Sequence, residues 1–307
     1  MFYNIRMKIL KKARVLPLAV KLAAAVPVAL LIVFLAVFFS NTGGANLAVP
    51  SSLPAVSVAA SLPQAADSSR QTIVEDFWRW TFSEAGIPEQ MGRNIAASAL
   101  ESPAFIMELL VVLQGGYYTH LLVDKQHALP LDYSPDDLVP LTAGGSFRIT
   151  RNDLLLRRSA AVALEEMAAA AAADGVILTA ASAYRSGARQ AEIFAWQVRT
   201  FGLEMAERQS ARPGHSQHQL GTALDFYPIN DSFAYTPSAP WLAANASRFG
   251  WSMSYPDGYE EVTGYRFEPW HYRYVGRDLA AFIDTYFEGI QQFALQFIQV
   301  WQERDSL

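Results

Sequence analysis

An uninterrupted apolar run of 18 residues, Leu22 to Phe39, constrains this chain more than any other feature of its sequence. Its length is close to the roughly 20 residues that a helix needs to cross a bilayer. Six basic residues and no acidic residue precede it within positions 1–21. This charge asymmetry predicts a cytoplasmic tail and an exported body, so we expect residues 1–39 to form that tail and a membrane anchor.

A cleaved signal peptide is the alternative interpretation of the same segment. The apolar region of a signal peptide usually spans about 7 to 15 residues, which is shorter than this run. Small residues around Ala45 to Ala48 nevertheless offer a cleavage site. Both interpretations place the main body of the protein outside the cytoplasm.

The chain contains no cysteine. Disulfides, cysteine-ligated metal sites and cysteine nucleophiles are therefore excluded, and a metal must bind to histidines and carboxylates. The formal net charge is −5, and the residues after position 21 hold 18 basic and 29 acidic side chains, a balance of −11. Such a body lacks the basic surface that neutralises phosphates, so we expect no nucleic-acid partner.

Composition divides the rest of the chain into a linker, a helical segment and a mixed body. Residues 40–70 are rich in Ser, Ala and Pro and nearly uncharged, which is typical of a linker. Residues 71–116 carry apolar side chains at helical spacing, so we expect a small helical subdomain. A main domain over 117–287 and a C-terminal helix over 288–307 complete the predicted organisation.

Capping residues mark two helices in the main domain. Thr150 and Asp153 resemble a capping box and predict the start of an alanine-rich helix that stops before Gly175. Ser186 is the expected N-cap of a second helix, which stops near Gly202.

Strands lie between and after these helices without a regular βαβ repeat. Residues 176–184 are apolar and partly β-branched, as expected of a strand. Further strands are expected over 221–227, 251–254 and 265–275. This order predicts an α+β fold with a small, mostly antiparallel sheet and flanking helices.

Two histidines and one aspartate have the chemistry and the sequence context of a metal site. His218 and Asp225 stand seven residues apart across Gly221, and His271 ends the segment Glu268-Pro-Trp-His. Two imidazoles and one carboxylate leave the fourth tetrahedral position of Zn²⁺ open for water, as in hydrolytic rather than structural sites. We therefore expect a zinc ion that activates water on these three residues.

Glu268 is the candidate general base that takes a proton from this water. In a flat strand, residues three apart point to opposite faces, so Glu268 and His271 would not converge. Pro269 permits a bend before strand pairing begins. We therefore place Glu268 in the loop before the strand and His271 on the strand itself.

Three segments together point to a known family. They are Ser182-Ala-Tyr-Arg-Ser with Gln190, the run from Pro213 to Asp225, and the run from Glu268 to Gly276. They resemble the VanY-type zinc D-alanyl-D-alanine carboxypeptidases of the LAS metallopeptidase group, and this combination of motifs in order is specific. The resemblance implies a metallo-carboxypeptidase that trims the terminal D-Ala from peptidoglycan stem peptides, with zinc on the three predicted ligands and Glu268 as general base.

The resemblance also implies roles for residues around the metal. Arg185 would bind the substrate carbonyl or carboxylate, and a guanidinium at the end of an apolar strand is well placed to stabilise a developing oxyanion. The implied pocket residues are Ser182, Gln190 and Ser216. The family often has Glu where this chain has Gln217, a difference that bears on substrate preference.

Two kinds of alternative function stay open at this point. An L,D-carboxypeptidase or an endopeptidase acting on peptidoglycan peptides would have the same metal site and differ in the pocket wall. A catalytically silent cell-wall-binding module would lack a ligand or the base, whereas this sequence has all four residues. We expect a single-pass membrane protein whose catalytic domain lies on the periplasmic or cell-wall side.

Overall fold

The computed structural model describes residues 75–144 and 146–304. Nearly all of them belong to one compact unit, Thr72–Val300. The predicted tail, anchor and linker, residues 1–70, lie outside the described residues. Among the described helices, none is by itself long and apolar enough to span a bilayer. The pair α4 (Glu89–Glu101) and α5 (Ala104–Gln114) satisfies that test only when taken together, with a bend of 102° between them.

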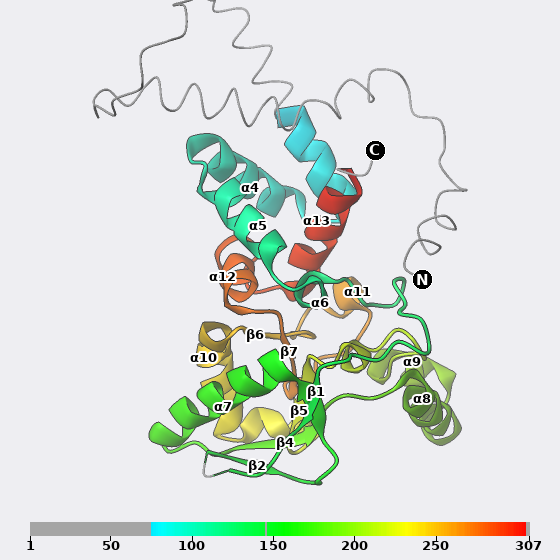
Figure 1. Cartoon of the computed structure of the whole chain (residues 1–307). Helices are drawn as coiled ribbons and strands as arrows, with labels where there is room; N and C mark the ends of the chain where they lie inside the picture. Colours follow the sequence, from blue (N-terminus) through cyan, green and yellow to red (C-terminus); the bar gives the residue numbers. More distant parts are fainter. Residues whose placement is uncertain (1–74, 145, 305–307) are drawn as a thin grey trace, which may run out of the picture. The chain divides into compact units, whose positions relative to one another are not determined.

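A five-stranded sheet lies at the centre of the main domain (Figure 1). In spatial order its strands are β2 (Phe147–Ile149), β4 (Leu178–Ser182), β5 (Ala223–Phe226), β7 (His271–Tyr274) and β6 (Trp251–Met253). The β2–β4 pair is parallel and the other three pairs are antiparallel. A separate antiparallel ladder joins β1 (Leu138–Pro140) to β3 (Leu155–Arg157). The predicted α+β fold with a small, mostly antiparallel sheet is confirmed.

The two faces of the sheet have different chemistry, because successive side chains of a strand point to opposite sides. Leu224 and Phe226 of β5 and Tyr272 of β7 belong to the main hydrophobic core. Asp225 and His271 alternate with them and therefore lie on the other face. The sheet thus presents an apolar side for packing and a polar side for chemistry.

Helices α7 (Arg158–Ala173) and α10 (Ser238–Asn245) supply much of the apolar core on the first face. Alanine is the commonest residue of α7, and small side chains allow a helix to approach a sheet closely. Its buried side chains are Ala160, Ala161, Ala163, Leu164, Met167, Ala168 and Ala171. Each buried methylene contributes about 0.8 kcal/mol of transfer free energy, so the packing on this face stabilises the folded sheet domain.

The capping box predicted at Thr150 and Asp153 is wrong. Helix α7 begins only at Arg158, and Asp153 instead forms a surface ion pair with Arg151. The intervening residues pair with β1 as strand β3, and the side chain of Arg157 contacts both Asp137 and the carbonyl of Leu220. Tertiary pairing outweighs the local capping signal here, because a cap contributes only about 1 kcal/mol.

The other predicted elements are present with shorter bounds. Ser186 caps α8 (Gly187–Phe201) by accepting a hydrogen bond from the backbone N–H of Arg189 at 3.2 Å, and the helix ends before Gly202 as expected. The strand predicted over 265–275 is reduced to β7, because residues 265–270 approach it through loops and a turn.

The helices at the two ends of the described chain share an aromatic core. The ring of Phe105 on α5 lies 5.2 Å from the ring of Phe282 on α12 (Arg277–Tyr286) and 5.6 Å from that of Phe297 on α13 (Gln291–Arg304). In Figure 1 these helices stack above the sheet domain. The division into a helical subdomain, a catalytic domain and a C-terminal helix stays a prediction.

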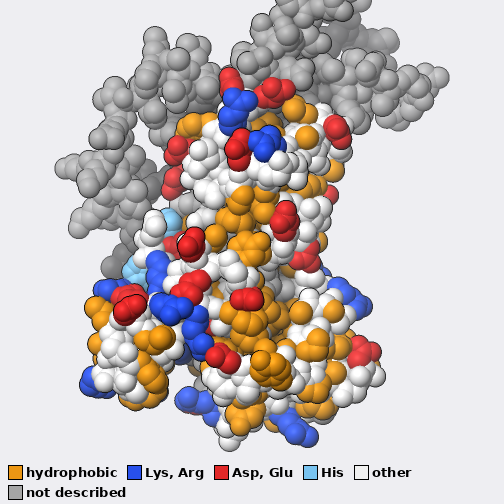
Figure 2. Space-filling model, turned by 180° about the vertical axis from the view of Figure 1, so that it is seen from behind, with side chains coloured by type: hydrophobic (Ala, Val, Ile, Leu, Met, Phe, Trp, Pro, Cys, Tyr) orange, Lys and Arg blue, Asp and Glu red, His pale blue; other side chains and the backbone are white. Residues whose placement is uncertain are grey.

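Charged residues are interspersed on the surface that Figure 2 shows, with acidic and basic side chains close to one another. Several form ion pairs, such as Arg266 with Asp231 at 2.9 Å and Arg208 with Glu260. Exposed pairs of this kind contribute about 0 to 1 kcal/mol each, so they add little to the stability that the core supplies.

Candidate active site

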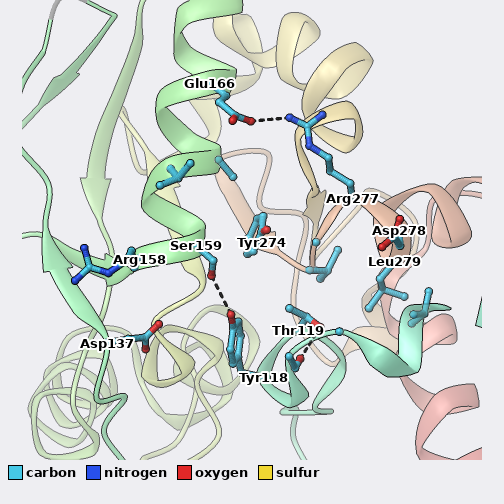
Figure 3. A pocket seen from close by; sticks show the side chains of 17 residues that line it. Tyr118, Thr119, Asp137, Arg158, Ser159, Glu166, Tyr274, Arg277, Asp278 and Leu279 are labelled. Carbon is cyan, nitrogen blue, oxygen red and sulfur yellow. Dashed lines mark hydrogen bonds and ion pairs between the residues drawn. The ribbon is translucent and has the colours of Figure 1, made fainter. Parts of the chain in front are cut away.

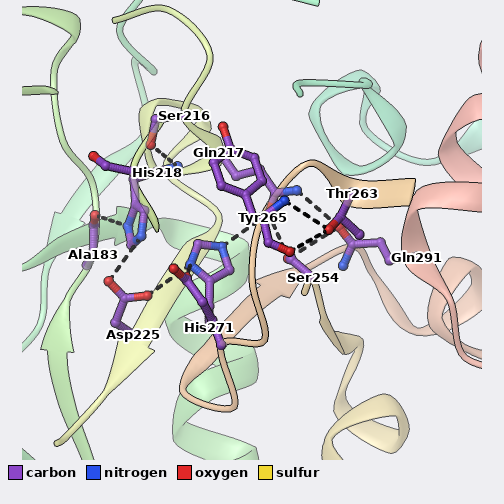
Figure 4. Close-up of polar contacts among 12 residues, drawn as sticks. Ala183, Ser216, Gln217, His218, Asp225, Ser254, Thr263, Tyr265, His271 and Gln291 are labelled. Carbon is purple, nitrogen blue, oxygen red and sulfur yellow. Dashed lines mark hydrogen bonds and ion pairs between the residues drawn. The ribbon is translucent and has the colours of Figure 1, made fainter. Parts of the chain in front are cut away.

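Three buried side chains meet on the polar face of the sheet (Figure 4). His218, Asp225 and His271 each offer a ligand atom, and these atoms lie within 4.8 Å of one another. Asp225 Oδ2 lies 3.2 Å from His218 Nε2, and Asp225 Oδ1 lies 2.9 Å from His271 Nδ1. The structure therefore brings together the three residues that the sequence predicts as metal ligands.

Different elements hold these side chains. Asp225 and His271 are register partners across the antiparallel pair β5–β7. His218 lies on a short 3₁₀ helix, η2 (Gln217–Leu220), whose N-cap Ser216 accepts a hydrogen bond from the His218 N–H at 3.3 Å. Gly221 then adopts φ +74°, and a Cβ there would lie 2.9 Å from Leu138 Cδ2, so only glycine fits this return into β5.

The backbone determines which nitrogen of His218 faces the cluster. Its Nδ1 lies 2.7 Å from the carbonyl oxygen of Ala183, which can only accept a hydrogen bond. Nδ1 therefore carries the proton, and Nε2 directs a lone pair toward Asp225. Burial and the nearby charge of Arg185 lower the pKa of His218 to about 4, so the imidazole is neutral at pH 7, as a metal ligand must be.

The donor set fits a cation. His218 Nε2 and Asp225 Oδ1 are buried and have no well-directed hydrogen bond within the part of the chain that the structure describes. A buried carboxylate between two imidazole lone pairs calls for a positive ion, and two nitrogens with one oxygen suit Zn²⁺.

Glu268 lies beside this cluster in the loop before β7, as the position of Pro269 predicts. Its Oε2 is 3.7 Å from His271 Nδ1, and its carbonyl accepts a hydrogen bond from the His271 N–H at 3.0 Å, which closes the turn. The side chain is buried, and only 8% of the residue is exposed. Burial and the charge of Asp225 raise the pKa of Glu268 to about 8.

Arg185 follows β4 and is half-buried, with its Nε buried at the site. Its Nε has no hydrogen-bond partner among the described residues. Burial lowers the pKa of Arg185, while the charges of Asp225 and Glu268 oppose that shift. A desolvated cation close to two carboxylates, with a free N–H, has the properties of an anion-binding group.

The three predicted pocket residues have different surroundings. Ser182 is paired with Asp225 in the β4–β5 register, and Ser216 caps the helix that carries His218. Gln190 is buried and donates a hydrogen bond from Nε2 to the carbonyl of Ala211 at 2.6 Å, so it also supports the neighbouring loop. Substrate binding by these three residues stays a prediction.

The structure adds contacts to His271 that sequence reasoning missed. The ring of Tyr255 lies 4.7 Å from the imidazole ring, and Gln217 Oε1 lies 3.2 Å from His271 Nε2. No local pattern marks Tyr255. The position of Gln217 next to His218 places it near the site, but spacing alone does not reveal that its side chain contacts His271.

A separate cavity of ≈ 730 Å³ lies between α7, the end of β7 and the start of α12 (Figure 3). Two pairs of its polar side chains contact each other: Tyr118 with Ser159 at 3.0 Å, and Arg277 with Glu166 at 2.6 Å. None of the candidate catalytic residues lines it, so we do not associate it with the reaction.

A buried cluster of two histidines and an aspartate, next to a glutamate and an arginine, has the composition that metal-dependent hydrolases use. The model of the VanY family, D-alanyl-D-alanine carboxypeptidase, matches residues 153–277. This match covers all the candidate site residues.

Two curated relatives extend the match. A D-alanyl-D-alanine carboxypeptidase of Enterococcus faecalis is 32% identical over 221 residues, which are 68% of this chain and 74% of the relative. The putative carboxypeptidase YodJ of Bacillus subtilis is 35% identical over 184 residues, 56% of this chain and 67% of the relative. The chain belongs to the VanY family of D-alanyl-D-alanine carboxypeptidases, which are peptide-bond hydrolases, as its motifs imply.

A solved structure supports the fold assignment. The vancomycin-resistance D,D-dipeptidase VanXYg, in complex with a D-Ala-D-Ala phosphinate analogue, superimposes with a TM-score of 0.52 at 27% identity. The match covers 58% of this chain and 70% of that structure.

Proposed function

We propose that this protein is a zinc-dependent D-alanyl-D-alanine carboxypeptidase that removes the terminal D-Ala from peptidoglycan stem peptides. One observation carries the proposal: His218, Asp225 and His271 converge within 4.8 Å in a chain of the VanY family. The buried Glu268 and the half-buried Arg185 beside them supply a base and an anion-binding group for peptide hydrolysis.

His218, Asp225 and His271 would hold the metal. When bound, Zn²⁺ supplies Lewis acidity and lowers the pKa of a coordinated water to about 7. A donor set of two nitrogens and one oxygen also accepts other divalent ions, so metal analysis of the purified protein is part of the test.

Glu268 acts as the proton carrier of the reaction. Its carboxylate takes the proton of the attacking water and later delivers it to the departing amine of D-Ala. A base must be ionised to do this, and the raised pKa of about 8 describes the residue without a neighbouring dication. A cation on the adjacent ligands lowers that pKa toward neutrality, where a general base is most effective.

Arg185 stabilises negative charge on the substrate. Its desolvated guanidinium donates to the carbonyl oxygen as charge develops there, or to the terminal carboxylate of the peptide. Ser182, Gln190 and Ser216 complete the proposed pocket. Because the protein has already desolvated the guanidinium, little reorganisation is needed when the reaction proceeds.

Defined stem peptides test this function. The purified full chain is incubated with a pentapeptide ending in D-Ala-D-Ala, a tetrapeptide and a cross-linked dimer, and the products are identified by mass spectrometry. We expect loss of one D-Ala from the pentapeptide, abolished by a chelator and restored by Zn²⁺. Exclusive cleavage of the tetrapeptide or the cross-link would assign one of the alternative peptidase activities, and wall binding without cleavage would indicate a silent module.

We also propose that the N-terminal segment anchors the enzyme to the membrane with its catalytic domain outside the cytoplasm. The basic residues before the apolar run at 22–39 support this orientation. Membrane fractionation and protease accessibility of intact cells or spheroplasts test it. A mature N-terminus after about Ala48 would instead show signal-peptide cleavage.

A further inference from the structure

A chain of buried side-chain contacts leads from His271 to the C-terminal helix (Figure 4). His271 Nε2 lies 3.2 Å from Gln217 Oε1, and Gln217 Nε2 lies 3.5 Å from Gln291 Oε1. Gln291 Nε2 in turn donates to the carbonyl of Ser252 at 3.2 Å. Ser254 Oγ also donates to Gln217 Oε1, at 2.7 Å.

This chain has a direction, which its far end determines. The carbonyl of Ser252 can only accept, so the amide of Gln291 must turn its NH₂ toward it and its oxygen toward Gln217. Gln217 must then present its own NH₂ to Gln291 and its oxygen to His271. The oxygen of Gln217 can only accept, so Nε2 of His271 carries the proton and Nδ1 keeps its lone pair.

The orientation matters because Nδ1 is the nitrogen that faces the proposed metal position, 2.9 Å from Asp225 Oδ1. A flipped Gln217 amide would place its NH₂ against Nε2. That contact favours the tautomer with the proton on Nδ1, which has no lone pair for a metal. A glutamate at this position would accept at both oxygens, so a glutamine needs a partner that sets its orientation.

We propose that Gln217, oriented by Gln291, is the positioning residue that selects Nδ1 of His271 for metal binding. The inference rests on the proposed zinc function. It gives the C-terminal helix α13 a part in the site, although α13 lies beyond the residues 153–277 that the family model matches. The backbone orients His218 directly, whereas His271 is oriented by a backbone carbonyl through two side-chain amides.

Zinc affinity measured by competition with a chromophoric chelator tests the proposal without an activity assay. Methionine replaces glutamine with nearly the same length but without the amide. We expect Gln217→Met to weaken zinc binding by about 10- to 100-fold, the usual effect of losing an outer partner of a ligating histidine. Gln291→Met acts through Gln217, so its expected loss is smaller, about 3- to 10-fold.

Gln292→Met is the matched control. Gln292 is the next residue of α13 and is also buried, but its Nε2 donates to Asp124 Oδ2 at 2.8 Å rather than to Gln217. It should bind zinc as tightly as the wild type. The visible spectrum of the Co²⁺-substituted protein gives a second readout, and we expect altered bands in Gln217→Met but not in the control.

A double-mutant comparison separates orientation from packing. In Gln217→Glu both oxygens accept, so zinc binding should stay within about threefold of the wild type, a margin well below the loss expected for Gln217→Met. Adding Gln291→Met to Gln217→Glu should then not weaken zinc binding any further. If Gln291 serves only packing, Gln291→Met will weaken zinc binding by the same factor whether position 217 is glutamine or glutamate. That result would overturn the proposal.

The remaining outcomes are also distinct. Wild-type zinc affinity and an unchanged Co²⁺ spectrum in Gln217→Met would overturn this inference alone. A wild-type chain that binds no zinc would overturn the proposed function and this inference with it. Circular dichroism verifies folding of each variant, and if Gln217→Met does not fold, the effect of Gln291→Met in the two backgrounds decides the question.

Discussion

Asp225 and His271 are direct partners across the β5–β7 ladder, and 2.9 Å separates Asp225 Oδ1 from His271 Nδ1. Backbone hydrogen bonds of the sheet therefore hold two of the three proposed ligands at their spacing. A one-residue slip of β7 would turn His271 to the apolar face, so the proposed metal site depends on the register of the sheet.

Replacing the shared carboxylate tests the metal site. We expect Asp225→Asn to lose zinc during dialysis and to release no D-Ala above background, because the neutral amide removes the anionic ligand. Metal analysis and the pentapeptide assay measure both effects. Asp153→Asn, which alters an exposed carboxylate paired with Arg151, serves as the control and should keep its zinc. Full zinc occupancy in Asp225→Asn would contradict the assignment.

The pH dependence of stability tests the environment of Glu268. Its pKa is raised from 4.5 to about 8 in the folded protein, because burial and Asp225 disfavour the charged form. The folded state therefore binds this proton more tightly than the unfolded state. The resulting stabilisation is complete below pH 4.5 and is lost as the pH rises through about 8.

We expect the metal-free Glu268→Gln variant not to lose this stabilisation as the pH rises. Its free energy of unfolding, measured by urea titration with chelator present, should exceed that of the wild type by more at pH 9 than at pH 5. His218, whose lowered pKa destabilises the fold in acid, is present in both proteins and cancels in the comparison. An equal difference at the two pH values would show that Glu268 is not desolvated.

Substituting Arg185 tests its role in charge stabilisation. We expect Arg185→Gln to lower kcat/KM for the pentapeptide by about 10²- to 10³-fold, as for the loss of one oxyanion donor. Zinc affinity should hardly change, since Arg185 is not a ligand. The control is Arg189→Gln, which removes an exposed arginine paired with Glu192. A loss below about threefold, far less than an oxyanion donor contributes, would assign Arg185 a structural role.

The start of α8 packs too tightly for any side chain at Gly187. A Cβ there would lie 2.5 Å from the carbonyl oxygen of Leu131. We expect Gly187→Ala to destabilise the protein by about 1 to 3 kcal/mol, because the backbone of residue 131 must move. Gly144→Ala, whose Cβ would meet no atom within 4 Å, should be nearly neutral. Equal urea midpoints for the two variants would contradict this packing.

Local patterns predicted the parts of the fold that depend on local chemistry. The cap at Ser186 and the loop position of Glu268 follow from residues within one turn of each, and the structure contains both. The capping box predicted at Thr150 was wrong because the start of this helix depends on residues outside the local segment. Pairing of β3 with the distant β1 decided where α7 begins, and no local signal reports a partner so far along the chain.

The sequence by itself determined which side chains supply the chemistry: two imidazoles, an aspartate, a glutamate and an arginine, in motifs that also identify the family. Only the tertiary structure decided which nitrogen of each histidine faces the metal position and which groups enforce that choice. Ligand type belongs to a single residue, whereas the tautomer of His271 depends on Gln217 and Gln291, which stand 74 residues apart. Such contacts exist only after the sheet and α13 have packed, so no local pattern contains them.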